Sequence, residues 1–182
     1  AFAKYLRKEI DTVIDHEWMR CILMSNAHRD SHDGFFTNEQ LDWLEKQLES
    51  AASDDRLALI CCHVPVHQNR HPDRGWYVKP DHGQTRFYEI TSKHRERVLA
   101  VLHGHFHNGI RGWTDNNGLH EVCLPSALYN LNRGLEEQQA PGFNPHEFRP
   151  GYTLLKVGQG AMTLQYKPTG EEPAVKREWK VS

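Results

Sequence analysis

The sequence predicts an α/β fold built on a mixed sheet, and two observations carry this prediction. Two near-continuous apolar runs, at residues 56–62 and 98–102, are typical of parallel strands that are covered on both faces. Segments with helical spacing precede both runs, which gives the order strand, helix, strand, helix, strand. After residue 112 the pattern changes to shorter strands joined by turns, which predicts a C-terminal β-hairpin.

The first helix is predicted to begin at Thr37, after a short buried strand at residues 20–25 and a polar loop. Thr37 and Gln40 have the spacing of a capping box, in which each side chain satisfies a backbone N–H of the first turn. An apolar stripe at helical spacing then continues to about Ser50, and its members are Leu41, Trp43, Leu44 and Leu48.

The remaining elements are predicted from the same kinds of pattern. A second helix is expected over residues 84–94, with Phe87 and Ile90 facing the core. Gly158-Gln159-Gly160 has the composition of a tight hairpin turn. The strands expected in the C-terminal half are residues 119–124, 152–157 and 161–166.

Composition narrows the class of protein. The 182 residues suffice for one domain, and the formal net charge of -2 gives no field that would favour nucleic acid or an acidic membrane. No apolar run approaches the roughly 20 residues of a membrane span. The four cysteines form no disulfide framework and are interpreted as buried small side chains, which favours a reducing, cytoplasmic location.

Histidines follow both apolar runs. His63 comes directly after the first run, and His105 and His107 come after the second. Carboxyl ends of neighbouring parallel strands meet at one edge of a sheet, and neutral imidazole is the commonest transition-metal ligand in proteins. In a strand-like turn His105 and His107 would point the same way, with Gly104 allowing a close backbone approach. A metal site is therefore predicted from the three histidines together. Either His63 with its proline or the His105–His107 pair, taken alone, is more often structural or a surface feature.

These motifs resemble a known family. C-H-V-P-V at residues 62–66 and G-H-F-H at residues 104–107 are similar to the last two signature blocks of the calcineurin-like metallophosphoesterases. The segment from Gly34 to Leu44 resembles the helix that precedes those blocks in phosphodiesterase-like members. The resemblance implies that the chain is part of a four-layer αββα sandwich.

The resemblance also implies a function, which is hydrolysis of a phosphate monoester or diester by a metal-activated water. The family's site holds two divalent metal ions, of the Mn, Fe, Zn or Mg class. The implied ligands are His63 and His105 for one metal and His107 for the other. Paired metals stabilise the charge on the phosphoryl oxygens and lower the pKa of a bound water.

The family's three earlier signature blocks are not found in this sequence. Residues 1–182 are therefore expected to form a partial domain, without the N-terminal half that carries the bridging aspartate and the general acid. That upstream half, or another chain, would have to complete the site. Ser25-Asn26-Ala27-His28 only faintly echoes the third block and is interpreted as coincidence. The alternative function is a non-catalytic metal-binding or interaction module that has lost the upstream carboxylates.

The small-molecule phosphoester substrate is expected to contact the loop after His63 and the turn after His107, while an ordinary polar surface loop is the competing interpretation. His103 is interpreted as structural or as a support for the ligands. Trp76 and Tyr77 also lie in the loop after His63. The candidate substrate-binding residues are His67, Asn69, Arg70 and Asn108.

Overall fold

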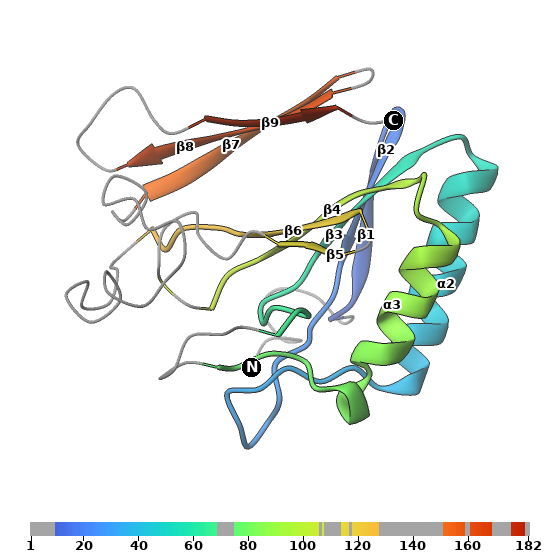
Figure 1. Ribbon diagram of the computed structural model, residues 1–182. Helices are drawn as coiled ribbons and strands as arrows, with labels where there is room; N and C mark the ends of the chain where they lie inside the picture. The colour runs from blue at the N-terminus through green and yellow to red at the C-terminus, as the bar shows by residue number, and fades with distance from the viewer. Residues whose placement is uncertain are drawn as a thin grey trace.

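The computed structural model contains two β-sheets and a pair of helices (Figure 1). It describes residues 10–68, 75–105, 107, 114–116, 118–127, 151–158, 161–168 and 176–180. In this part of the chain the helices cover one face of the larger sheet and the smaller sheet covers the other (Figure 1). These three layers agree with the predicted α/β phosphoesterase-like architecture with a C-terminal hairpin.

The larger sheet is mixed and has the strand order β1-β2-β3-β4-β6-β5. The four central strands β2, β3, β4 and β6 are mutually parallel, as the near-continuous apolar runs predict. The short edge strands β1 and β5 are antiparallel to their neighbours and were not expected from the sequence. The strands are Thr12–His16 (β1), Met19–Leu23 (β2), Leu57–Cys61 (β3), Val98–His103 (β4), Thr114–Asn116 (β5) and Leu119–Cys123 (β6).

Helices α2 (Asn38–Ser53) and α3 (Gln84–Lys93) lie side by side on one face of this sheet (Figure 1). The capping box at the start of α2 is confirmed. The Gln40 backbone N–H donates to the Thr37 hydroxyl at 3.2 Å, and the Thr37 N–H donates to the Gln40 side-chain oxygen at 3.0 Å. A short 3₁₀ turn, Pro80–His82 (η1), precedes α3. Most predicted core positions of the two helices are buried, namely Leu41, Leu44, Leu48, Phe87 and Ile90. Trp43 of the predicted stripe is only half-buried and packs against the edge of this core.

The smaller sheet packs against the opposite face. Its strands β7 (Gly151–Gly158), β8 (Ala161–Pro168) and β9 (Lys176–Lys180) are antiparallel in the order β7-β8-β9. The β7–β8 hairpin was predicted, whereas β9 was not. The buried residues between the two sheets form the sheet-side core, which comprises Leu59, Leu99, Ala100, Leu102, Val122, Met162, Leu164 and Tyr166.

Strand alternation decides which core each side chain of the large sheet enters. Val101 packs in the helix-side core with α2 and α3, while Leu102 packs in the sheet-side core. Cys62 and Cys61 likewise face the helix-side and sheet-side cores, as their adjacency predicts. All four cysteines are free, so the predicted absence of disulfides is confirmed. By the same alternation His103, two residues after Val101, faces the helix side.

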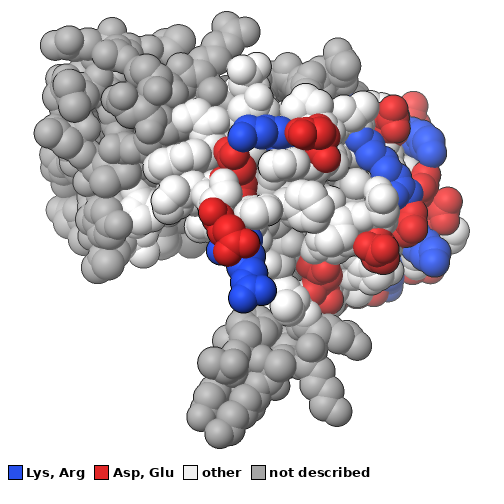
Figure 2. Space-filling model, turned by 90° about the horizontal axis from the view of Figure 1, so that it is seen from below, with Lys and Arg blue, Asp and Glu red and all other residues white. Residues whose placement is uncertain are grey.

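The described surface carries no large region of one charge on the face that Figure 2 shows, where acidic and basic side chains lie close to one another. Ion pairs also join the two helices. Lys93 of α3 contacts Glu45 of α2 at 2.7 Å, and Arg86 contacts Asp42. Within the described residues, no helix is both long enough and apolar enough to cross a membrane.

Candidate metal centre

The carboxyl ends of β3 and β4 bring His63 and His105 together. The Cys62 N–H donates to the Leu102 carbonyl, and the Gly104 N–H donates to the His63 carbonyl, both at 3.0 Å. These backbone bonds continue the pairing of the two strands beyond their last residues. The His105 Nδ1 and His63 Nε2 atoms lie 3.1 Å apart, and the ring centroids are 4.9 Å apart. The structure thus joins two of the three predicted ligands.

The spacing of these two nitrogen atoms fits a shared metal ion. Zinc–imidazole bonds of about 2.0–2.1 Å at ordinary coordination angles place neighbouring ligand atoms about 3–3.5 Å apart. Both rings also favour the neutral form, which keeps a lone pair for a metal. Burial, together with the nearby His107, lowers the pKa of His63. Burial, followed by the effect of His63, lowers the pKa of His105 to about 4.

After burial, His107 is a secondary cause of the lowered pKa of His63 and a smaller cause of the lowered pKa of His105. The backbone around it differs from the strand-like turn that the sequence suggested. His105 has a φ of 76° and His107 a φ of 52°, so both adopt the left-handed conformation that favours glycine. Left-handed backbone at two non-glycine residues, and not extended alternation, therefore directs these rings. Such strain in a well-packed structure is typical of functional sites.

Asn26 fixes the turn that carries His63, and sequence reasoning missed this role. Its side chain is fully buried, and its oxygen accepts the backbone N–H groups of His63 at 3.0 Å and Val64 at 2.9 Å. Its amide nitrogen donates to the Val64 carbonyl at 2.6 Å. The short motif around Asn26 gave no signal for this contact, because the partners lie 37 and 38 residues further along the chain.

Two glycines near the site have different steric demands. A Cβ atom on Gly104 would lie 3.9 Å from the His63 ring, which is an ordinary contact, so the close approach expected there does not require glycine. A Cβ on Gly34 would lie 2.6 Å from Val78 and 3.1 Å from Val64. Gly34 also bridges to Val78, so this glycine is the one that allows close packing beside His63.

Comparison with known proteins supports the fold. A dimetal phosphatase from Danio rerio has a similar structure, with a TM-score of 0.60 and 16% sequence identity over 91% of this chain. The chain has the fold of a dimetal phosphatase. It spans 58% of the length of that protein. The predicted α/β fold with a C-terminal hairpin is thereby confirmed, and the described residues form three of the four layers that the resemblance to the calcineurin-like metallophosphoesterases implies.

A putative 5'-nucleotidase from Staphylococcus aureus also aligns, with a TM-score of 0.40 and 12% identity over 65% of this chain and 24% of that one. That score is too low to establish a shared fold. No family model and no curated protein matches the sequence. The fold that this chain shares with the dimetal phosphatase is therefore supported by the structure and not by overall sequence similarity.

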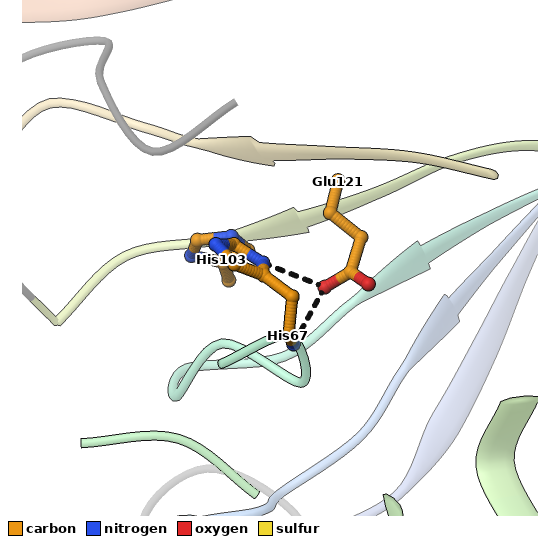
Figure 3. Close-up of side chains that lie close together, drawn as sticks. All are labelled: His67, His103 and Glu121. Carbon is orange, nitrogen blue, oxygen red and sulfur yellow. Dashed lines mark hydrogen bonds and ion pairs between the residues drawn. The ribbon is translucent and has the colours of Figure 1, made fainter. Parts of the chain in front are cut away.

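A second group of potential ligands lies within this phosphatase fold. His67 follows β3, His103 ends β4, and Glu121 lies in β6, and their side chains point toward one another (Figure 3). Their ligand atoms all lie within 4.8 Å of one another, so the group has the composition and spacing to hold a metal ion. Burial lowers the pKa of His103 well below its usual value, which favours the neutral imidazole that binds metals.

Glu121 was not singled out from the sequence. It lies in the apolar strand Leu119–Cys123, where one acidic residue has no recognisable motif. Its side chain is fully buried, and Tyr88 of α3 donates a hydrogen bond to its Oε1 atom. The only hint in the sequence was an acidic residue inside a strand expected to be buried. A buried carboxylate requires compensating partners, but the sequence does not show which residues they are.

The predicted substrate-binding residues are only partly described. The His67 ring contacts Glu121 through Nδ1 at 3.0 Å, while Asn69, Arg70 and Asn108 lie outside the described residues. Trp76, from the same loop as His67, lies with its ring centroid 5.2 Å from that of His105. An aromatic ring thus lies beside the His63–His105 pair.

Proposed function

We propose that this chain takes part in metal-dependent hydrolysis of a phosphate ester and supplies three histidine ligands to a dinuclear site. His63 and His105 would bind one metal, and His107 would bind the other. The observation that supports this proposal best is the 3.1 Å separation of the His63 and His105 ring nitrogens at the strand ends of a dimetal-phosphatase fold. Ligand crevices of open α/β sheets lie at this edge.

The residues of the chain have defined tasks in this proposal. Divalent metal ions held there would activate a water molecule and neutralise charge on the phosphoryl oxygens. Asn26 holds the backbone of His63, and the Gly104-to-His63 hydrogen bond sets the spacing of the two strand ends. The Trp76 ring lies beside the His105 ring, where it could contact a bound substrate.

We propose that the bridging carboxylate and the general acid come from outside these residues. The sequence has no match to the three earlier signature blocks, and the chain spans 58% of the dimetal phosphatase. An upstream half of the domain or another chain would supply them. The substrate is proposed to be a small phosphate monoester or diester, with His67, Asn69, Arg70 and Asn108 as candidate contacts.

The test uses the full-length protein loaded with Mn²⁺ and assayed on p-nitrophenyl phosphate and bis(p-nitrophenyl) phosphate. We expect hydrolysis of at least one ester. His63→Ala and His105→Ala should each lower kcat/KM by about 100-fold or more, since each removes a metal ligand. His120→Ala is the matched control, because His120 lies on β6 outside the proposed ligand set. Hydrolysis that persists undiminished in His105→Ala would refute the proposal.

The alternative of a non-catalytic metal-binding module is supported by one observation. The group of His67, His103 and Glu121 could hold a metal without any residue beyond this chain. A full-length protein that contains stoichiometric metal and hydrolyses neither ester would support this alternative.

A further inference from the structure

We propose that His67, His103 and Glu121 form a second metal site, which binds a single zinc-class ion and is separate from the His63–His105 pair. The three side chains converge from the loop after β3, from the end of β4 and from β6 (Figure 3). None of them belongs to the three histidines of the proposed dinuclear site, and in this proposal His67 binds the metal instead of contacting the substrate. The inference therefore goes beyond the proposed function and does not depend on it.

The geometry suits a cation shared by these groups. His67 Nδ1 and Glu121 Oε2 lie 3.0 Å apart, a distance at which either an N–H donated by the ring or a shared cation would join them. A proton would account for that one pair. A cation also accounts for the third donor, because the ligand atom of His103 lies within 4.8 Å of both others.

The three side chains are largely buried. Glu121 is fully buried and His103 is 2% exposed, while the His67 side chain is 12% exposed. A buried carboxylate is costly unless a positive charge and hydrogen bonds compensate for its lost hydration. Among the described residues, the imidazole of His67 lies within ion-pair distance of Glu121, and it carries a charge only when it is protonated. A divalent cation among the three groups would supply the compensating charge in full.

The surrounding hydrogen bonds orient the carboxylate as a ligand. Tyr88 donates to Glu121 Oε1, and the His67 backbone N–H donates to Oε2 at 3.1 Å. Metal-binding carboxylates commonly have such supporting donors, which fix their orientation. Two imidazoles and one carboxylate are a donor set that suits zinc, with a fourth position for water.

The site would crosslink three elements of the larger sheet. It lies on the helix side, since Val101 and Leu119 precede His103 and Glu121 by two residues and pack in the helix-side core. Bound metal would fix the loop that follows His63 to β4 and β6. Zinc should therefore raise the melting temperature of the protein, because it binds only the folded state.

The test measures metal binding in the double variant His63→Ala/His105→Ala, which removes the pair of the proposed dinuclear site. After chelator treatment and dialysis against zinc, elemental analysis should find one zinc per chain. Replacement by Co²⁺ should give the visible absorption of a low-symmetry nitrogen and oxygen site. Adding His67→Ala or Glu121→Gln to this background should weaken zinc binding by more than about 100-fold.

Two controls separate ligand loss from misfolding. Tyr88→Phe removes a hydroxyl that contacts Glu121 but no proposed ligand, so it should keep one zinc per chain. His120→Ala removes a histidine that alternation places on the opposite face from Glu121, and it should also keep the metal. If Glu121→Gln fails to fold, the less buried His67→Ala decides the result. Absence of zinc from the double variant, or unchanged zinc affinity in His67→Ala, would overturn the proposal.

Discussion

At the scale of single residues, the position of His63 depends on Asn26, a buried side chain from another loop. Asn26 makes three hydrogen bonds to the backbone of His63 and Val64. Because this turn lies just beyond the end of a strand, no neighbouring strand is available to pair with the backbone N–H of His63 or the N–H and C=O of Val64. The amide of Asn26 replaces that partner, which makes the ligand turn rigid.

Asn26→Ala should destabilise the protein by about 3 kcal/mol, because buried N–H and C=O groups would lose their partners. Urea unfolding followed by circular dichroism measures the change in the free energy of unfolding. The exposed neighbour Ser25 provides the control, and Ser25→Ala should change it by less than about 0.5 kcal/mol. Equal effects of the two substitutions would contradict the role assigned to Asn26.

Gly34→Ala and Gly104→Ala form a second comparison. The added methyl group would clash with Val78 at position 34 but make only an ordinary contact at position 104. We expect Gly34→Ala to lower the free energy of unfolding by about 1–3 kcal/mol and Gly104→Ala to change it by no more than about 0.5 kcal/mol. Thermal melts of the two variants show which substitution lowers the stability more. A larger loss for Gly104→Ala would show that the packing around Gly34 is looser than described.

The proximity of His63 and His105 could be predicted because each follows an apolar strand in α/β order. Glu121 and Asn26 could not be predicted in the same way. Each is a single polar residue that makes its contacts through tertiary structure, and neither has a partner at a recognisable spacing. The left-handed backbone of His105 and His107 was also invisible, since nothing in G-H-F-H distinguishes it from an extended turn.

At the scale of elements, a buried arginine joins β1, β2 and α2. Arg20 of β2 is 6% exposed and binds Asp15 of β1 through two hydrogen bonds, at 2.6 and 2.9 Å. It also donates to the Gln47 carbonyl of α2 at 3.3 Å. The hydrogen bond from Arg20 lowers the pKa of Asp15 below its usual value. This contact therefore secures the edge strand.

Asp15→Asn should lower the free energy of unfolding by about 1 kcal/mol at pH 7, a modest value because the Asp15 side chain is 36% exposed. The carboxylate has a lower pKa in the folded state than in the unfolded state. Its contribution is therefore complete above the unfolded pKa of about 3.9 and is lost as the pH falls through the folded value.

Urea titrations between about pH 7 and pH 2 test this dependence. The difference between the wild-type protein and Asp15→Asn should be constant above about pH 5 and shrink below about pH 4. A difference that grows on acidification would contradict the lowered pKa of Asp15.

The central strands and both helices could be predicted because burial imposes a clear pattern on their sequences. β3 and β4 are nearly continuous apolar runs, and α2 has a capping box and an apolar stripe. The edge strands lacked such patterns. β1 has no fully buried residue, and β5 is three residues long, so neither carries an apolar period that would distinguish it from a loop.

At the scale of the whole molecule, two cores hold three layers together. The sheet-side core depends on side chains of β8, because Met162, Leu164 and Tyr166 are fully buried there. The opposite face of the small sheet is more open, since Tyr152 and Leu154 of β7 are 57% and 39% exposed. The two faces of this sheet therefore contribute unequally to stability.

Leu164→Ala should lower the free energy of unfolding by about 3 kcal/mol, because it leaves a cavity between the sheets. Leu154→Ala on the outer face is the matched control and should cost less than about 1 kcal/mol. Denaturant unfolding of both variants measures these values. Similar losses for the two variants would mean that the outer face of the small sheet is also covered.

The left-handed backbone at His105 and His107 affects which residue types suit these two positions. Glycine relieves such a conformation, and asparagine tolerates it better than most other residues. Glycine at either position would relieve the backbone but would also remove an imidazole ring. Stability and the proposed metal site therefore make opposite demands on these two positions.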